Sequence, residues 1–474
     1  MSVGIYLKDI SDEHLSLIKN LLTIKPKLTF FDLKRKRWKK KEDPDDSSKE
    51  DILFFKIKDN AIYIPYIFYE KMTGNKANLL KIQYGLYTSI KAEVKGKLFE
   101  TQVSVYEQLL AALMSKGTAN LNVYTGFGKT VVSAIASINL KLRVLILINN
   151  TILAQQWKST YNEFTTANVY VVDSAEEPPK DAEVIICMST RVHYLSQNFY
   201  NSIGTLIIDE AHTFCTPSRV EALLCTQPKY IIAATATLER EQDGLHVMIE
   251  AMCGSESIYK KSVKPFNAIL YNTGYNAEVP HNRYGEFNWT QHVNNLCNCG
   301  ERNQLIIDLI TNNLSCKILV LTGRQNHVLD LHDRMQKLSI KVDYMVGNKK
   351  KYSDSNVLIG TVKKLGTGFD ERTACLNFEG FPINLLIIVI SIKKTALLAQ
   401  TSGRCFRSQF PSVICLYDQN GISDKHMEKN TKWFESVNGI VTYVESEKAK
   451  RIKTSSDKNS ADVASAHISK YLKK

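Results

Sequence analysis

The sequence has no apolar stretch long enough to cross a membrane as a helix. Its longest uninterrupted apolar run lies near Leu385–Ile390, whereas a membrane-spanning helix needs roughly 18 apolar residues. The first residues also lack the apolar core of a secretion signal, because charged side chains stand there at Lys8, Asp9, Asp12 and Glu13. We therefore expect neither membrane association nor a signal peptide.

Disulfides and structural zinc are also not indicated. The chain has 10 cysteines scattered over 474 residues, whereas disulfide-stabilised secreted domains are short and dense in cysteine. The tightest group, His292, Cys297 and Cys299, contains one Cys-x-Cys pair instead of the two pairs typical of structural zinc. Reduced thiols in an intracellular compartment are the expectation.

The composition is that of a globular protein with a polyanionic partner. Apolar residues make up 44% of the chain and charged residues 23%, which excludes disorder of the whole chain. The length predicts about three domains at roughly 100–200 residues each. Lys and Arg number 61 against 48 Asp and Glu, a net charge of +13, and such an excess favours a partner such as nucleic acid.

Part of the excess charge is concentrated in one segment. Lys34-Arg35-Lys36-Arg37-Trp38-Lys39-Lys40-Lys41 is basic at every position except Trp38. Three readings remain open for it: a solvated loop, a nuclear-import signal or a nucleic-acid contact.

Short β-branched runs alternate with helix-length stretches in two separate blocks. Such alternation builds parallel sheets covered by helices on both faces. We expect an α/β fold with two tandem parallel-sheet domains and a small N-terminal α+β unit. The expected divisions are an N-terminal accessory domain at 1–95, a first sheet domain at 96–262, a connector at 263–300, a second sheet domain at 301–445 and a basic tail at 446–474. The expected strands are Asn120–Tyr124, Arg143–Ile148, Asn168–Val172, Glu183–Cys187, Thr205–Ile208, Tyr230–Ala234, Lys317–Leu321, Lys341–Met345, Asn356–Gly360, Leu385–Ile390 and Ser412–Tyr417.

The N-terminal unit shows a helix and two strands. Ser11 is placed to cap a helix that runs to about Leu22. Asp51–Lys58 and Ala61–Tyr69 are rich in Ile, Phe and Tyr, which favours strands.

A glycine turn between a strand and a helix predicts a phosphate-binding site. The turn reads Thr125-Gly126-Phe127-Gly128-Lys129-Thr130. The two glycines let backbone N–H groups surround a phosphate chain, and the helix adds its positive end. Lys129 would reach the β and γ oxygens, and the Thr130 hydroxyl would bind Mg²⁺. The full pattern calls for glycine where this chain has Val123, so a chance turn is the alternative.

Two carboxylates follow an apolar strand further along the chain. Leu206-Ile207-Ile208 leads into Asp209-Glu210-Ala211-His212, and ligands of open α/β sheets bind beyond the carboxyl ends of strands. Asp209 would bind the same Mg²⁺ ion as Thr130, and Glu210 would orient a water that attacks the γ-phosphate. The alternative is a pair that caps the next helix.

In this order, the motifs resemble those of superfamily 2 helicases in their DEAH-box form, from about residue 99 to 410. The resemblance implies two RecA-like domains, ATP and Mg²⁺ as cofactors, and nucleic acid as partner. It implies an adenine contact for Gln102 and coupling of hydrolysis to strand movement for His212, Thr235 and Thr237.

The run Leu147 to Trp157 resembles the first strand-contact motif, with Asn149 in place of the usual proline. The implied nucleic-acid contacts are Thr151, Thr190, Arg191, Thr361, Lys363 and Lys364.

Two further motifs lie in the second block. Gly366-Thr367-Gly368-Phe369-Asp370 resembles the fifth motif, which implies nucleotide contacts for Gly368 and Asp370. Gln400-Thr401-Ser402-Gly403-Arg404-Cys405-Phe406-Arg407 fits the last motif, Q-x-x-G-R-x-x-R, and implies catalytic roles for Gln400, Arg404 and Arg407. A guanidinium delivered from a second domain would stabilise the charge on the γ-phosphate. We expect Arg407 to be that finger, with Arg404 second; a basic helix face is the alternative.

Within the superfamily, the chain is similar to helicases of large cytoplasmic DNA viruses, the poxviruses and iridoviruses. Glu301-Arg302-Asn303-Gln304-Leu305-Ile306, which opens the second block, also fits that group. The similarity implies a DNA helicase or translocase of 3′→5′ polarity that acts in viral transcription, in the host cytoplasm or the virion. The sequence leaves the oligomeric state open and is compatible with a monomer. Two alternatives are an RNA helicase on the same ATPase and a non-catalytic scaffold, for which Val123 and Asn149 are the motivation.

Overall fold

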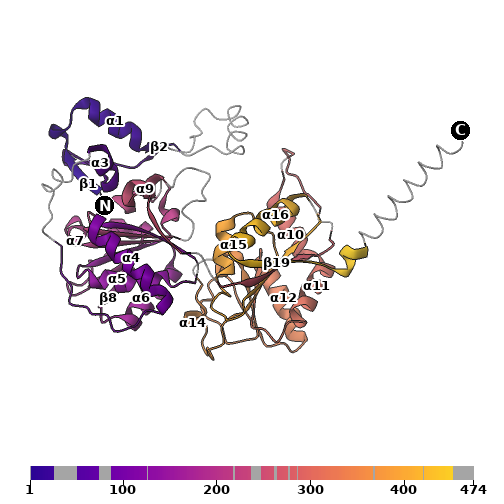
Figure 1. The fold of residues 1–474 in the computed structure, drawn as a ribbon. Coiled ribbons are helices and arrows are strands. Elements are labelled where there is room, and N and C mark those ends of the chain that lie inside the picture. The colour runs from indigo at the N-terminus through magenta and orange to yellow at the C-terminus, as the bar shows by residue number, and fades with distance from the viewer. Residues whose placement is uncertain are drawn as a thin grey trace, which may run out of the picture. The chain divides into compact units, whose positions relative to one another are not determined.

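The computed structural model describes residues 2–25, 51–73, 87–124, 126–216, 219–235, 247–260, 264–275, 278–285, 287–366, 369–419 and 421–451. The chain divides into a first unit, Met1–Lys260, and a second unit, Lys261–Lys474 (Figure 1). The basic run at 34–41 and most of the expected tail lie outside the described residues. Within the described ranges, no helix has both the length and the apolar character that a membrane span requires.

The first unit is built on a parallel sheet of seven strands in the order β12-β6-β11-β10-β7-β9-β8. The strands are β6 (Thr118–Val123), β7 (Val144–Ile148), β8 (Val169–Val171), β9 (Val184–Met188), β10 (Thr205–Asp209), β11 (Tyr230–Ala234) and β12 (Ser257–Lys260). The helices around it are α4 (Glu100–Lys116), α5 (Lys129–Asn139), α6 (Thr151–Phe164), α7 (Gln197–Asn201), α8 (Val220–Leu224) and α9 (Val247–Cys253).

Both faces of this sheet are buried, because alternate residues of each strand enter different cores. Ile146 and Ile207 belong to a core shared with α4, α5 and α6. Leu145 and Leu206 belong to a second core shared with α7, α8 and α9. Burial on both faces is the reason that these strands read as nearly continuous apolar runs.

The N-terminal residues pack on the second of these cores. They form β1 (Ser2–Tyr6), α1 (Asp12–Leu22), β2 (Thr23–Ile24), β3 (Ile52–Leu53), β4 (Lys56–Lys58), β5 (Ala61–Pro65) and α3 (Tyr66–Thr73). Strands β1, β5 and β4 make an antiparallel sheet, and Ile62 and Ile64 are fully buried in the shared core. The N-terminal segment therefore lies within the same compact unit as the first parallel sheet.

The predicted N-terminal helix is confirmed, and one predicted strand is too long. The Ser11 side chain caps α1 by accepting a hydrogen bond from the His14 N–H at 3.3 Å. The expected strand Ala61–Tyr69 ends at Pro65, and α3 begins at Tyr66. Aromatic content favoured a strand there, but α3 buries Tyr66 and Ile67 in the shared core, so tertiary packing overrides the local preference.

The second unit repeats the plan with a parallel sheet in the order β15-β16-β14-β17-β18-β13-β19. Its strands are β13 (Phe266–Asn272), β14 (Ile318–Thr322), β15 (Val342–Met345), β16 (Val357–Thr361), β17 (Leu385–Ile388), β18 (Ser412–Tyr417) and β19 (Gly439–Glu445). Its helices are α10 (Trp289–Asn298), α11 (Gly300–Thr311), α12 (Gln325–Lys337), α13 (Val362–Leu365), α14 (Glu371–Ala374), α15 (Thr395–Ser402) and α16 (Gly421–Ser436). Helices α11 and α12 cover one face, and α15 and α16 the other (Figure 1).

Every strand predicted in the two blocks is present, and three more were missed. Strands β12 and β19 lie at sheet edges, and β13 lies within residues 263–300, which we expected to connect the blocks. In the structure β13 pairs with β18 on one side and β19 on the other. The expected connector thus supplies a strand of the second sheet.

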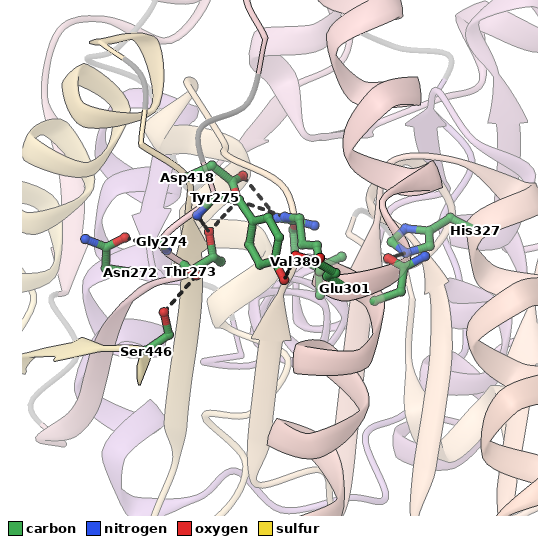
Figure 2. A network of polar contacts seen from close by, with 11 residues as sticks. Asn272, Thr273, Gly274, Tyr275, Glu301, His327, Val389, Asp418 and Ser446 are labelled. Atoms are coloured by element: carbon green, nitrogen blue, oxygen red, sulfur yellow. Dashed lines mark hydrogen bonds and ion pairs between the residues drawn. The ribbon is translucent and has the colours of Figure 1, made fainter. Parts of the chain in front are cut away.

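A buried ion pair ties α11 to three neighbouring strands of the second sheet. The fully buried Arg302 donates from Nε to Asp418 Oδ1 at 2.8 Å and from Nη2 to the Val389 carbonyl at 2.7 Å. The Thr273 hydroxyl donates to the same carboxylate at 2.6 Å. Figure 2 shows Asp418, Thr273 and Val389 around this point, beyond the ends of β18, β13 and β17. Loss of one partner would leave a buried charge uncompensated.

Candidate nucleotide site and nucleic-acid interface

The glycine turn after β6 has the backbone conformation that a phosphate cradle requires. Gly126 and Gly128 have φ angles of 91° and 96°, in the left-handed region that glycine adopts without steric cost. Gly128 caps α5, so Lys129 and Thr130 form the first turn of that helix. The first N–H groups of a helix lack partners inside it and favour an anion. Thr125 lies outside the described residues.

The Gln102 side chain braces this turn from α4. Its Nε2 donates to the Phe127 carbonyl at 2.8 Å, and its Oε1 accepts from the Phe99 N–H at 3.0 Å. A Cβ atom at Gly128 would lie 2.4 Å from the same Nε2, so a larger residue there would have to displace the Gln102 amide in addition to adopting a left-handed φ. The structure places Gln102 against the phosphate turn, and its contact with adenine stays a prediction.

Asp209 ends β10 as a buried carboxylate with one strong hydrogen-bond donor. The Trp157 indole of α6 donates from Nε1 to Asp209 Oδ2 at 2.7 Å. Burial, and next the charge of Glu210, raise the pKa of Asp209 to about 6, against the opposing effects of the indole bond and the Lys129 charge. The influence of Lys129 places the lysine that we expect to bind phosphate in one electrostatic environment with the acidic pair. The sequence did not assign a role to Trp157, although it ends the first strand-contact motif.

Glu210 has a strained backbone conformation, and its carbonyl group belongs to a hydrogen-bond network. Its φ of 50° is left-handed for a residue that is not glycine, a state that costs about 1–3 kcal/mol and occurs often at functional sites. The Thr213 hydroxyl donates to the Glu210 carbonyl at 2.8 Å, and the Asn149 amide donates to that hydroxyl. Asn149, which replaces the usual proline, thereby ties the end of β7 to the acidic segment.

His212 connects the acidic segment to the end of β11. Its Nδ1 lies 2.8 Å from the Thr235 hydroxyl and 3.6 Å from Glu210 Oε2. The structure thus brings together two of the residues expected to couple hydrolysis to movement. The third, Thr237, lies outside the described residues.

Two of the three expected nucleic-acid contacts of the first unit are accessible. Thr151 begins α6 after β7, and Thr190 lies in the 3₁₀ helix η3 (Ser189–Tyr194) after β9; both are exposed. Strands β7 and β9 are neighbours, so the two threonines lie at the same edge of the sheet. Arg191 instead donates to the Val172 carbonyl at 2.7 Å.

In the second unit, the fifth and last motifs are joined by hydrogen bonds. Arg407 binds Asp370 through two contacts, Nη1 to Oδ1 at 3.0 Å and Nη2 to Oδ2 at 2.6 Å. Arg404 donates to the Phe369 carbonyl, and to the Gly366 carbonyl at 3.1 Å. Both candidate finger arginines therefore lie at the fifth motif. Their contact with a nucleotide stays a prediction.

The same pair sets the charge state of Asp370. Burial alone would raise the pKa of Asp370, but the hydrogen bonds and charge of Arg407 outweigh it and lower that pKa. Asp370 also caps α14 by accepting from the Arg372 N–H at 2.9 Å. Gln400 is buried in α15, and Gly368 lies outside the described residues.

The chain is similar in sequence to one family model and to several proteins with helicase or transcription names. The family model of the res subunit of type III restriction enzymes matches residues 95–240. The 161L protein of Invertebrate iridescent virus 6, which carries a provisional helicase name, is 26% identical over 428 residues, 84% of this chain and 93% of the relative. Transcript termination protein A18 of Yaba-like disease virus is 23% identical over 387 residues, 70% of this chain and 75% of the relative.

Solved structures share the two-unit fold. Dbp5 of S. cerevisiae bound to RNA and ADP BeF3 has a TM-score of 0.51 at 14% identity and covers 75% of this chain and 92% of its own. The restriction-modification enzyme LlaBIII bound to DNA has a TM-score of 0.52 at 13% identity and covers 74% of this chain and 32% of its own. The relatives with helicase names and this shared fold support a superfamily 2 helicase core for the chain.

Basic residues gather where the strands of the second sheet have their carboxyl ends. They follow the ends of four adjacent strands, β15, β16, β14 and β17. They are Lys349, Lys350 and Lys351 after β15, Lys363 and Lys364 after β16, Arg324 after β14, and Lys393 and Lys394 after β17. Burial, and next the charge of Lys350, lower the pKa of Lys364, which shows that like charges lie close together here.

Only part of this basic edge was predicted from the sequence. Lys363 and Lys364 were expected contacts, and Lys363 and Lys350 are exposed. Thr361, also an expected contact, is mostly buried and caps α13 by accepting from the Lys364 N–H at 3.2 Å. The other lysines were missed because only the order of the strands in the sheet brings them to one edge.

Proposed function

We propose that this chain is a nucleic-acid-stimulated ATPase that uses hydrolysis of ATP to ADP and phosphate to move along, and unwind, a nucleic-acid strand. The observation that carries the proposal is the buried Asp209, which lies within the electrostatic reach of Lys129 and is held by the Trp157 indole. A buried carboxylate beside a phosphate-binding turn suits a bound cation better than a structural role.

The donor atoms at this site fit Mg²⁺. A carboxylate oxygen of Asp209 and the hydroxyl of Thr130 are the hard ligands that this ion takes, with water and phosphate oxygens completing its shell. Mg²⁺ would neutralise charge on the β- and γ-phosphates. Lys129 would add a second positive charge, and Glu210 would orient the attacking water.

In this proposal the second unit supplies the guanidinium groups. Arg407 would leave Asp370 for the γ-phosphate, with Arg404 and Gln400 beside it, whereas Gln102 would recognise adenine. We keep the domain division of the sequence analysis, with β13 assigned to the second helicase domain. Closure of the two domains on ATP would then be coupled to strand movement through His212 and Thr235.

We further propose that the substrate is DNA, that movement runs 3′→5′, and that the step served is viral transcription in the host cytoplasm or the virion. The similarity to the A18 transcript termination proteins of two poxviruses supports the transcription step, whereas DNA and the 3′→5′ direction are what the family resemblance implies. An RNA substrate is the second candidate, because a relative from Acanthamoeba polyphaga mimivirus, 22% identical over 357 residues, carries an RNA helicase name.

The test is ATP hydrolysis measured with a panel of single- and double-stranded DNA and RNA. We expect stimulation by nucleic acid and its loss in Lys129→Ala. Lys116→Ala, which removes an exposed lysine paired with Glu256, is the matched control and should hydrolyse ATP like the wild type. Near-normal stimulated hydrolysis in Lys129→Ala would contradict the proposal, and stronger stimulation by RNA would favour the second candidate.

A further inference from the structure

A cavity of about 430 Å³ lies in the first unit, away from the glycine turn. One wall is a face of the N-terminal sheet, and the other comes from η3, α7 and α8. A volume of this size lies in the range of small-molecule sites. Its position beside η3 is informative, because η3 carries the exposed Thr190 expected to contact a nucleic-acid strand.

The register of the N-terminal sheet decides which side chains reach the cavity. Gly4 pairs with Tyr63 and Tyr6 with Ala61, while Lys56 also pairs with Tyr63. Directly paired residues, and residues two positions apart on one strand, share a face. Tyr6, Tyr63 and the lysines of β4 therefore project from the face that lines the cavity, opposite to the buried Ile62 and Ile64.

Two tyrosines offer aromatic surface in the cavity. A Cβ atom at Gly4 would lie 2.9 Å from Cε1 of Tyr63, which shows that the Tyr63 ring lies directly over β1 at the one position without a side chain. Tyr6, two residues along the same strand, is 56% exposed. Aromatic rings on an open sheet face are the surfaces on which single-stranded nucleic acids stack their bases.

The opposite wall carries polar groups that suit the edge of a base. Gln197 and Asn201 of α7 line the cavity, with the Gln197 amide donating to Asn201 Oδ1 at 3.2 Å. Amide groups donate and accept at once, as base edges do. The exposed His193 of η3 lies on the same wall.

The charges in the cavity are balanced. Lys56 lies 3.3 Å from Glu221, and Lys58 lies 3.9 Å from Asp59. A site for phosphate would carry an excess of positive charge. Neutral charge, aromatic rings and amides together favour a base over a phosphate group.

We propose that this cavity takes one nucleobase of the single strand that η3 binds, stacked on Tyr6 and Tyr63 and bonded at its edge by Gln197 and Asn201. The inference rests on the proposed function and extends its nucleic-acid track onto the N-terminal sheet. It also assigns the N-terminal residues a role in strand binding, which the ATPase motifs leave unexplained.

The experiment measures binding of fluorescein-labelled oligothymidylate and oligouridylate by anisotropy at several salt concentrations, without ATP. Loss of one stacked base corresponds to roughly tenfold weaker binding. We expect this loss in Tyr6→Ala and in Tyr63→Ala, with an unchanged dependence of affinity on salt, since no phosphate contact is lost. Tyr259→Ala is the matched control, because Tyr259 is 55% exposed in the same unit and lies outside the cavity; it should bind like the wild type.

A strand of the same length without bases gives the decisive comparison. Wild-type protein and Tyr6→Ala should bind this abasic strand equally, because the cavity has no base to hold. Tyr6 is mostly exposed, so its replacement keeps the test valid even where Tyr63→Ala fails to fold.

Three outcomes would overturn the assignment: less than twofold loss in Tyr6→Ala, a reduced salt dependence in that variant, or the same loss on the abasic strand. In each case the proposed function survives if the wild type still binds nucleic acid and hydrolyses ATP. If the wild type binds neither DNA nor RNA, both the proposed function and the assignment of the cavity as a nucleobase site fail. The oligouridylate arm shows whether the bound strand is DNA or RNA.

Discussion

Replacement of Trp157 by phenylalanine tests the acidic centre most directly. The variant keeps a large aromatic ring in the core but removes the indole N–H that lies 2.7 Å from Asp209 Oδ2. A hydrogen bond to a charged group contributes about 1.5–3 kcal/mol, and each pKa unit corresponds to about 1.4 kcal/mol. The pKa of Asp209, about 6 in the native protein, should therefore rise by roughly one to two units in Trp157→Phe.

The consequence should appear in the magnesium requirement of ATP hydrolysis. Mg²⁺ needs the ionised carboxylate and competes with the proton for it. Activity at limiting Mg²⁺ should therefore rise with pH through about 6 in the wild type and at a higher pH in Trp157→Phe. At neutral pH the ionised fraction of Asp209 would fall from about nine-tenths at a pKa of about 6 to about one half at 7 or one tenth at 8, so the variant should need roughly two to ten times more Mg²⁺ for half-maximal rate.

Tyr161→Phe is the control for this experiment. Tyr161 lies on the same helix, its ring centroid is 6.2 Å from that of Trp157, and its hydroxyl bonds to Ser137 at 2.7 Å. The Tyr161→Phe replacement removes this buried hydroxyl and leaves the hydrogen bond between Trp157 and Asp209 in place. A wild-type Mg²⁺ requirement and pH profile in Trp157→Phe, with the folded state verified by urea unfolding, would refute the assigned role of the indole.

Four other replacements test the second unit. Arg407→Ala should lower turnover by about 10³-fold, as loss of a finger does, while a non-hydrolysable ATP analogue still binds; a loss below tenfold would mean that another group is the finger. Asp418→Ala should lower the free energy of unfolding by about 3–5 kcal/mol in urea titrations, because Arg302 is left buried and unpaired, whereas Asp333→Ala, at a side chain 68% exposed, should change it little. Lys350→Gln and Lys363→Gln should each reduce the slope of log affinity against log salt for single strands by about 0.7, and an unchanged slope would remove that lysine from the strand path.

The positions of the candidate site residues in the fold could be predicted because their order along the chain is itself informative. Lys129 and Thr130 begin the helix after the glycine turn, and Asp209 and Glu210 stand at the end of β10, in both the prediction and the structure, since strand, turn and helix are local features. The two-sheet fold followed from the same alternation, because strands buried on both faces leave continuous apolar runs in the sequence.

The contacts between distant segments could not be predicted in this way. Trp157 meets Asp209, and Arg407 meets Asp370, only once α6 packs on the sheet and the last motif folds back on the fifth. The strand β13 was missed because Pro265 and Asn267 obscure a run whose partners, β18 and β19, come far later in the chain. The cavity beside η3 depends on strand pairing in the N-terminal sheet, which the sequence pattern left open.

The contact between Gln102 and the glycine turn constrains how this chain can vary over evolution. Because the amide lies beside Gly128, a methyl group at that position would have to displace the Gln102 side chain and would also hold a left-handed φ. A shorter residue 102 would remove the first obstacle, leave the second, and lose the brace on Phe127. Glycine at 128 is therefore required by the backbone whatever stands at 102, whereas the brace depends on a long amide side chain there.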